Sequence, residues 1–284
     1  MSVIGTAVPY LDAAATLRRY GLHARKQLGQ SFLVDPGALE QIAATAEIDR
    51  SDTVLEIGAG LGHLTRYLAR AAGKVLAVEI DARLLPPLRD VTDVYANVEV
   101  VQGDILELSP ANLGLQSGYL LVANIPYYIT SAVVRHVLES EPKPRRIVLT
   151  LQAEVAERIC AGPGDLSLLA LSVQVYGRPS LRARIPAAAF HPVPKVDSAT
   201  LSVDVYLKPL IAAALLPMFF RLIKAGFHQK RKMLHNSLAA GLGRKPADLG
   251  TWLEAAGIDS KRRAETLSID EWRRLCESFG GAAD

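Results

Sequence analysis

Short apolar segments rich in Val, Ile and Leu recur along the chain from residue 53 onward, with amphipathic segments between them. Because these runs are apolar at nearly every position, they predict strands buried on both faces of a sheet. The predicted strands are Thr53–Ile57, Val75–Ile80, Val98–Val101, Tyr119–Ala123 and Ile147–Leu151. The predicted helices between them are His63–Ala72, Ala82–Thr92 and Thr130–Ser140. This alternation predicts an α/β fold with a doubly wound, mostly parallel sheet.

The segments around this region predict further elements. Pro36–Ala46 has the pattern of a helix with Asp35 as its N-cap and proline at its first position. Leu169–Tyr176 and Ala199–Tyr206 have the pattern of strands without a helix between them, which predicts an antiparallel addition at one edge of the sheet.

The β pattern stops after residue 209, and the rest of the chain is helical in pattern. The predicted helices are Ala212–Lys224, Lys230–Gly241, Pro246–Ala256 and Ile269–Phe279. We therefore expect an α/β domain over residues 1–207, with 1–25 as an extension, and a small all-helical domain over 208–284.

Composition narrows the class of protein. The chain has 284 residues, of which 50% are hydrophobic and 21% charged, which is typical of a globular protein. Its two cysteines, Cys160 and Cys276, cannot form a disulfide framework, and no spacing suits a metal. The longest apolar run, near Leu210–Phe220, is shorter than the roughly 20 residues that span a bilayer. The N-terminus lacks a signal-peptide pattern, so we expect a soluble, cytoplasmic protein without a metal or a membrane partner.

The net charge of +3 is unevenly distributed. Residues 208–263 contain 11 Lys and Arg against 3 Asp and Glu, a balance of +8, so the remaining residues sum to −5. A positive segment on a slightly negative body indicates a polyanionic partner.

A glycine-rich loop follows the first predicted strand. Gly58, Gly60 and Gly62 lie between that strand and a helix, and Glu56 precedes them. A dinucleotide fingerprint would require glycine at position 63, which is His63, and no P-loop motif is present. The spacing favours S-adenosylmethionine, whereas a glycine-rich turn without a ligand is the alternative.

Two acids at the ends of the next strands support this interpretation. Glu79 ends the second strand, where a carboxylate can accept hydrogen bonds from ribose hydroxyls. Asp104 ends the third and can accept a bond from an adenine amine, with Ile105 against the ring. Either acid alone could be a solvated residue at a strand end.

The sequence Asn124-Ile125-Pro126-Tyr127 follows the fourth strand. The N6 amine of adenine is a poor nucleophile because its lone pair is delocalised into the ring. The Asn124 side-chain oxygen and the Pro126 carbonyl could hold its two N–H groups and localise the lone pair, while Tyr127 stacks on the base. The alternative is an ordinary turn with exposed aromatic residues.

These motifs, with others along the chain, resemble the ribosomal RNA adenine dimethyltransferases of the small-subunit, kasugamycin-sensitivity type. The resemblance covers nearly everything from His23 to Leu275. Its segments are Lys26–Leu33, Glu56–Gly60, Val78–Asp81, Gly103–Asp104, Asn124–Tyr128, Gln152–Arg158, Phe190–Ser198, Phe227–Lys232 and Arg263–Ser268.

The resemblance implies transfer of methyl groups from S-adenosylmethionine to N6 of two adjacent adenosines, in a hairpin near the 3′ end of small-subunit rRNA, during assembly. The catalytic residues that it implies are Asn124, Pro126, Tyr127 and Phe190, the last as a second aromatic beside the base. The implied cofactor-binding residues are Gln30, Ser31, Leu33, Gly58, Gly60, Glu79, Asp104, Ile105 and Asn124.

The chain departs from the family pattern at three places. Ser31 stands where Asn is common, and Ala59 where Pro is common. Leu168-Leu169 replaces a common Tyr-Gly.

The basic residues expected to contact RNA are Arg25, Lys26, Lys224, Lys230, Arg231 and Lys232. The alternative is a solvated helix face. The last three are expected around a helix, where they cannot all be paired locally.

Three other functions fit part of this pattern. A large-subunit rRNA methyltransferase that confers macrolide resistance shares the Asn-x-Pro-Tyr core, but the segments Phe227–Lys232 and Arg263–Ser268 favour the small-subunit type. A DNA adenine methyltransferase usually has Pro-Pro-Tyr. A non-catalytic assembly or transcription factor would not need Glu79, Asp104 and Asn124 intact. We expect a monomer whose partner is small-subunit rRNA.

Overall fold

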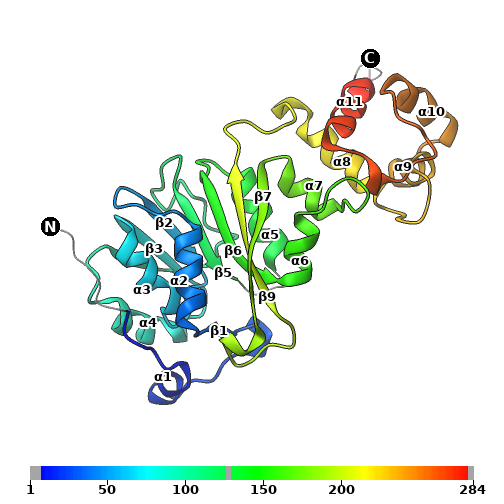
Figure 1. The fold of residues 1–284 in the computed structure, drawn as a ribbon. Coiled ribbons are helices and arrows are strands. Elements are labelled where there is room, and N and C mark those ends of the chain that lie inside the picture. The colour runs from blue at the N-terminus through cyan, green and yellow to red at the C-terminus, as the bar shows by residue number, and fades with distance from the viewer. Residues whose placement is uncertain (1–7, 126–128, 281–284) are drawn as a thin grey trace. The chain divides into compact units, whose positions relative to one another are not determined.

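A seven-stranded sheet with the order β4-β3-β2-β5-β6-β9-β7 dominates the N-terminal part of the computed structural model, which describes residues 8–125 and 129–280 (Figure 1). Its strands are β2 (Thr53–Ile57), β3 (Lys74–Glu79), β4 (Val98–Gln102), β5 (Leu120–Asn124), β6 (Arg146–Gln152), β7 (Gly177–Ile185) and β9 (Ser198–Val205). The pairs from β4 to β6 are parallel, and β9 is antiparallel to β6. The predicted doubly wound sheet with an antiparallel addition is confirmed.

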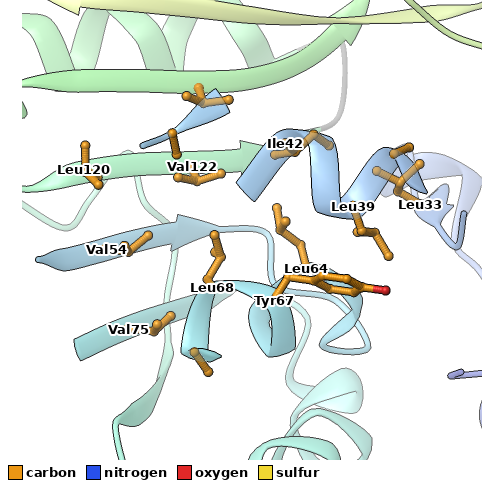
Figure 2. Packing of buried hydrophobic residues seen from close by; sticks show 14 of the residues in the cluster. Leu33, Leu39, Ile42, Val54, Leu64, Tyr67, Leu68, Val75, Leu120 and Val122 are labelled. Carbon is orange, nitrogen blue, oxygen red and sulfur yellow. The ribbon is translucent and has the colours of Figure 1, made fainter. Parts of the chain in front are cut away.

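Helices pack on the sheet through their apolar faces. The helices of this region are α2 (Pro36–Thr45), α3 (His63–Ala71), α4 (Leu85–Thr92) and α5 (Thr130–Glu139). Asp35 caps α2 as predicted, because its side chain accepts a 2.8 Å hydrogen bond from the Ala38 N–H. Figure 2 shows Leu39 and Ile42 of α2, with Leu64 of α3, packed over the buried strand residues. This packing fixes the elements whose ends form the site.

The strand order reverses between β2 and β5. These strands are adjacent and parallel, with Ile57 beside Ala123, so the glycine-rich loop after β2 and Asn124 at the end of β5 emerge together. In open α/β sheets this switch point at the carboxyl ends is where ligands bind.

A second, two-stranded sheet joins segments that are distant in the chain. β1 (Phe32–Leu33) pairs antiparallel with β8 (Phe190–His191), so that Leu33 lies opposite Phe190. The N-terminal helix α1 (Ala13–Arg19) contributes Leu17 to a cluster that contains Phe32. Nothing in the hydrophobic pattern predicted this pairing.

The predicted strand Leu169–Tyr176 is wrong. This segment forms helix α7 (Leu168–Gln174), and the strand β7 begins only at Gly177. The Ser167 hydroxyl caps the helix by accepting a 3.1 Å hydrogen bond from the Ala170 N–H. A short run that is apolar on all sides fits a buried helix as well as a strand, so periodicity could not separate the two.

The described residues divide into two compact units, one within Met1–Ala156 and Ser180–Val205, the other within Glu157–Pro179 and Tyr206–Asp284. The helix α6 (Ala153–Ile159) spans the first boundary. The expected domain of residues 1–207 therefore includes a segment whose contacts lie with the C-terminal helices. Within the second unit the Tyr176 and Phe220 rings stack with their centroids 6.2 Å apart, and the Gly164 N–H donates a 2.9 Å hydrogen bond to the Glu265 carbonyl.

The second unit is helical, as its pattern predicts. Its remaining helices are α8 (Leu216–Gly226), α9 (Leu234–Leu242), α10 (Pro246–Ala255) and α11 (Ile269–Gly280). Trp272 of α11 packs tightly against α8, where a side chain at Gly226 would lie 2.5 Å from the indole ring. No helix among the described residues has the length and apolar character of a transmembrane segment.

The predicted start of the helix at Lys230 is wrong. α9 begins at Leu234, and residues 227–233 form a turn after α8. The Leu234 N–H, which a longer helix would use internally, donates a 2.7 Å hydrogen bond to the Arg262 carbonyl. Lys230, Arg231 and Lys232 therefore lie on a turn instead of a helix.

Candidate active site

A cavity of about 270 Å³ opens at the carboxyl ends of β2, β3 and β5, at the switch point of the sheet. It is lined by all nine residues that the sequence predicts to bind the cofactor and by Phe190. Pro126 and Tyr127, which were predicted to be catalytic, lie outside the described residues. The tertiary structure thus brings the remaining predicted residues of this site together.

The glycine loop forms one wall of the cavity. Gly58, Gly60 and Gly62 have φ angles of 73°, 60° and 84°, in the left-handed region that favours glycine. A side chain at Gly60 would also lie 3.1 Å from the Phe32 ring. The loop therefore requires glycine both for its conformation and for the close approach of the N-terminal segment.

The Glu79 carboxylate is fixed by two backbone N–H groups. One carboxylate oxygen accepts a 2.8 Å hydrogen bond from the Gly60 N–H, and the other accepts one of 2.8 Å from the Asp81 N–H. A carboxylate has roughly four acceptor positions, so both oxygens can still accept bonds from a ligand. Burial raises the pKa of Glu79, and the two backbone bonds oppose this shift.

Glu56 is a second buried acid at the site, and we did not assign it a binding role from the sequence. Its side chain is 1% exposed, it lines the cavity, and its Oε2 has no hydrogen-bond partner among the described residues. Burial, with the nearby charge of Glu79, raises its pKa to about 8. The signal in the sequence was an acid placed two residues before Gly58.

His63 is also buried at the cavity wall, with 5% of its surface exposed. Its Nε2 lies 3.1 Å from the Leu11 carbonyl oxygen, and burial lowers its pKa to about 4. The imidazole is therefore neutral near pH 7 and links α3 to the N-terminal segment. In the sequence, this histidine served only to exclude a dinucleotide motif.

Asn124 points one end of its amide at the N-terminal segment. Its Nδ2 donates a 3.4 Å hydrogen bond to the Ser31 carbonyl, so Oδ1 is the end left to accept a bond from a ligand. Phe190 lines the same cavity, but only 3% of its surface is exposed and it belongs to the hydrophobic core. It can therefore present at most one edge or face to a ligand.

Gln30, the first residue of the predicted cofactor set, is hydrogen-bonded to Arg25 and to Asp81. Gln30 donates a 2.9 Å hydrogen bond from Nε2 to Asp81, and its Oε1 accepts one of 2.7 Å from the Arg25 N–H. The pKa of Asp81 falls to about 2, chiefly because Arg83 donates to its carboxylate. Gln30 therefore ties the N-terminal segment to the end of β3.

The residues present fit S-adenosylmethionine. Its sulfonium and ammonium groups are cationic, and the cavity contains two buried acids, one of which has an oxygen without a partner among the described residues. Glu79 keeps acceptor positions for a ribose diol, and Ile105 supplies an apolar surface for a base. Asp104 holds the adjacent turn by accepting a 2.9 Å bond from the Leu106 N–H.

The predicted RNA-binding residues whose side chains the structure describes do not line this cavity. Arg25 is exposed, as are Lys224 on α8 and the three cations of the following turn. No ion-pair partner is found for Lys230, Arg231 or Lys232 among the residues that the structure describes. Lys26 belongs to a short 3₁₀ turn, Lys26–Leu28, and its side chain lies outside the described part of the chain.

Comparison with known proteins gives a consistent result. Residues 21–280 match the family model described as ribosomal RNA adenine dimethylase. A Dehalococcoides mccartyi protein named ribosomal RNA small subunit methyltransferase A is 44% identical over 98% of this chain and 99% of its own.

Two crystal structures resemble most of the fold. The 23S rRNA methyltransferase ErmE is 31% identical, with a TM-score of 0.69 over 88% of this chain and 99% of its own. A dimethyladenosine transferase from Plasmodium falciparum is 26% identical, with a TM-score of 0.74 over 88% of this chain and 98% of its own.

Proposed function

This chain belongs to the ribosomal RNA adenine dimethylase family, and from that premise we propose that it dimethylates N6 of two adjacent adenosines in the 3′-terminal hairpin of small-subunit rRNA. The family membership makes it an S-adenosylmethionine-dependent rRNA methyltransferase. The subunit, the hairpin and the timing during ribosome assembly are the proposed part.

The observation that carries the choice of subunit is the extent of similarity. Identity to the relative named for the small subunit is 44% over nearly the full length of both chains, against 31% to the 23S rRNA enzyme. The segments Phe227–Lys232 and Arg263–Ser268 favour the same choice.

The orientation of Asn124 supports its proposed catalytic role. Because Nδ2 is engaged by the Ser31 carbonyl, Oδ1 can accept one N–H of the target N6. The Pro126 carbonyl would hold the other N–H, and Tyr127 and Phe190 would contact the flipped base. The bound cofactor supplies an electrophilic methyl group. With one N–H bonded to Asn124, the N6 lone pair would form the new N–C bond while the methyl–sulfur bond of the cofactor breaks and leaves a neutral thioether. The methylated nitrogen would then lose a proton to solvent.

The charge distribution supports an RNA-binding role for the helical unit. Residues 208–263 carry a balance of +8, and the cations of the turn after α8 are exposed and distant in sequence from the cavity residues. We assign them, with Lys224, Arg25 and Lys26, to RNA phosphate binding. A cytoplasmic monomer that acts on an assembling small subunit fits this assignment.

The test is transfer of tritiated methyl groups from S-adenosylmethionine to immature small subunits and, in parallel, to large subunits. We expect label in small-subunit rRNA, recovered as N6,N6-dimethyladenosine near the 3′ end. Label confined to large subunits would reject the proposed target and place the chain with the 23S rRNA enzymes. Label in neither substrate would reject the proposal as a whole.

A further inference from the structure

Ser31 is the point at which three segments of the site meet. Its hydroxyl donates a 2.7 Å hydrogen bond to the Pro192 carbonyl, and its own carbonyl accepts the 3.4 Å bond from Asn124. The next two residues form β1, which pairs with β8 and places Leu33 opposite Phe190. A single residue is thus bonded to the asparagine on β5 and to the segment that carries Phe190.

The hydroxyl is already engaged in a way that limits contact with the cofactor. A serine hydroxyl has one O–H to donate, and here it is directed to Pro192. The carboxylate of a methionyl group only accepts hydrogen bonds, so it would have to compete with Pro192 for this donor. The resemblance placed Ser31 among the residues that bind the methionine end, whereas the hydrogen bonds of Ser31 in the structure are to Pro192 and Asn124.

The paired segments need such an additional tie. β1 and β8 have two residues each, and a ladder of this length is marginal by itself. The Ser31–Pro192 bond extends the contact by one residue beyond the ladder, and Ser31 itself lines the cavity. It therefore restricts how far Phe190 and Asn124 can move apart.

We propose that Ser31 is a positioning residue that holds Asn124 and Phe190 in register across the base-binding end of the cavity, and that its side chain does not bind the cofactor. The inference rests on the proposed function, in which Asn124 and Phe190 contact the target adenine. Ser31 acts through its bonds to Pro192 and to Asn124.

Two variants of the full chain test this role. Ser31→Ala removes the hydroxyl, and Ser31→Thr keeps it. For Ser31→Ala we expect the Kd for S-adenosylmethionine, measured by calorimetry, to stay within about twofold of wild type. We expect kcat at saturating cofactor to fall by about 2- to 10-fold, as the loss of one hydrogen bond implies. Ser31→Thr, which keeps the hydroxyl, should have a kcat near that of wild type.

The opposite pattern would overturn the proposal. A Kd raised about tenfold with kcat unchanged at saturation would make Ser31 a cofactor ligand. Unchanged values of both constants in Ser31→Ala would give the side chain no role. On an Asn124→Ala background, Ser31→Ala should cause little further loss of kcat, whereas a full additive loss would show that it does not act through Asn124.

A measurement without substrate separates this proposal from the proposed function. Hydrogen exchange of the backbone amides in Phe32–Val34 and Phe190–His191 should be faster in Ser31→Ala and near wild type in Ser31→Thr. Unchanged exchange in Ser31→Ala would overturn the tie even in an active enzyme. If wild type methylates neither subunit but the exchange behaves as expected, the tie holds and the proposed function fails.

Discussion

The backbone N–H of Gly60 donates a 2.8 Å hydrogen bond to Oε2 of Glu79, which joins the glycine loop after β2 to the acid at the end of β3. The two motifs lie on adjacent parallel strands, and this bond fixes the carboxylate at the cavity wall. The loop conformation and the orientation of the acid therefore depend on each other.

Replacement of Glu79 should weaken cofactor binding. In Glu79→Ala the ribose hydroxyls lose a charged acceptor and the Gly60 N–H loses its partner, so we expect a loss of about 1–3 kcal/mol in calorimetric binding of S-adenosylmethionine. Glu99→Ala, which removes an exposed acid on β4, is the matched control and should bind normally. Unchanged affinity in Glu79→Ala would reject the assignment.

Cofactor affinity should rise with pH because of Glu56. Its pKa of about 8 keeps the carboxyl largely protonated at pH 6.5, and a bound cation favours the ionised form. Two neighbouring groups also act on this pKa: the polar Thr65 side chain lowers it, and the charge of Glu79 raises it. We expect affinity to increase by about tenfold between pH 6.5 and 8.5, with proton release detected by calorimetry in buffers of different ionisation enthalpy. In Glu56→Gln both effects should disappear.

Glu56 should also make the stability of the folded protein fall as pH rises, whereas it makes cofactor affinity rise. Between about pH 4.5 and 8 the unfolded chain has Glu56 ionised while the folded chain retains its proton, so this group makes the free energy of unfolding fall as pH rises. Thermal unfolding of Glu56→Gln should therefore depend less on pH across this range than that of wild type. Equal pH dependence of the two proteins would contradict the raised pKa.

Asn124→Ala should lower turnover by about 10²-fold or more, because N6 loses the acceptor that localises its lone pair. RNA binding should survive. Asn112→Ala, at an exposed asparagine outside the cavity, is the control for the substitution itself. If Asn124→Ala turned over like wild type on immature small subunits, the chemistry would lie elsewhere.

Turnover by wild type should depend little on pH between about 6.5 and 8.5 when the cofactor is saturating, since the proton leaves only after methylation and no enzymic base sets the rate. The measurement is kcat across this range with the cofactor concentration kept well above its Kd at each pH. A bell-shaped profile of kcat would indicate a titrating catalytic group instead.

The turn after α8 should supply RNA affinity. Replacement of Lys230, Arg231 and Lys232 by Ala should weaken RNA binding and reduce its salt dependence, by a slope of roughly 0.9 for each duplex phosphate that the variant no longer neutralises. Cofactor affinity should not change.

A control with the same loss of charge is Arg135, Arg273 and Arg274 replaced by Ala, since these cations are paired with Glu139, Asp270 and Glu277. If the two triple variants show the same salt slope, the cations of the turn are only solvated.

The sequence determined the features that depend on local pattern. Runs of buried apolar residues predicted the parallel strands, and Asp35 before Pro36 predicted the start of α2. The positions of Gly58, Glu79 and Asn124 at strand ends were sufficient to bring them to one cavity, because parallel strands share a carboxyl edge. Gly60, Asp104 and Ile105 follow from the same pattern, whereas the resemblance to the family supplied Gln30, Ser31 and Leu33.

The tertiary structure decided what local pattern leaves open. The apolar run of α7 fits a helix or a strand, and Ser167 with the surrounding core selects the helix. The start of α9 depends on a hydrogen bond to Arg262, which is 28 residues away in the chain. The pairing of β1 with β8, and with it the role of Ser31, joins segments more than 150 residues apart. Likewise, the shifted pKa of Glu56 follows from burial. Pairing and burial across such separations depend on how the whole chain packs, whereas hydrophobic periodicity reports only on local structure.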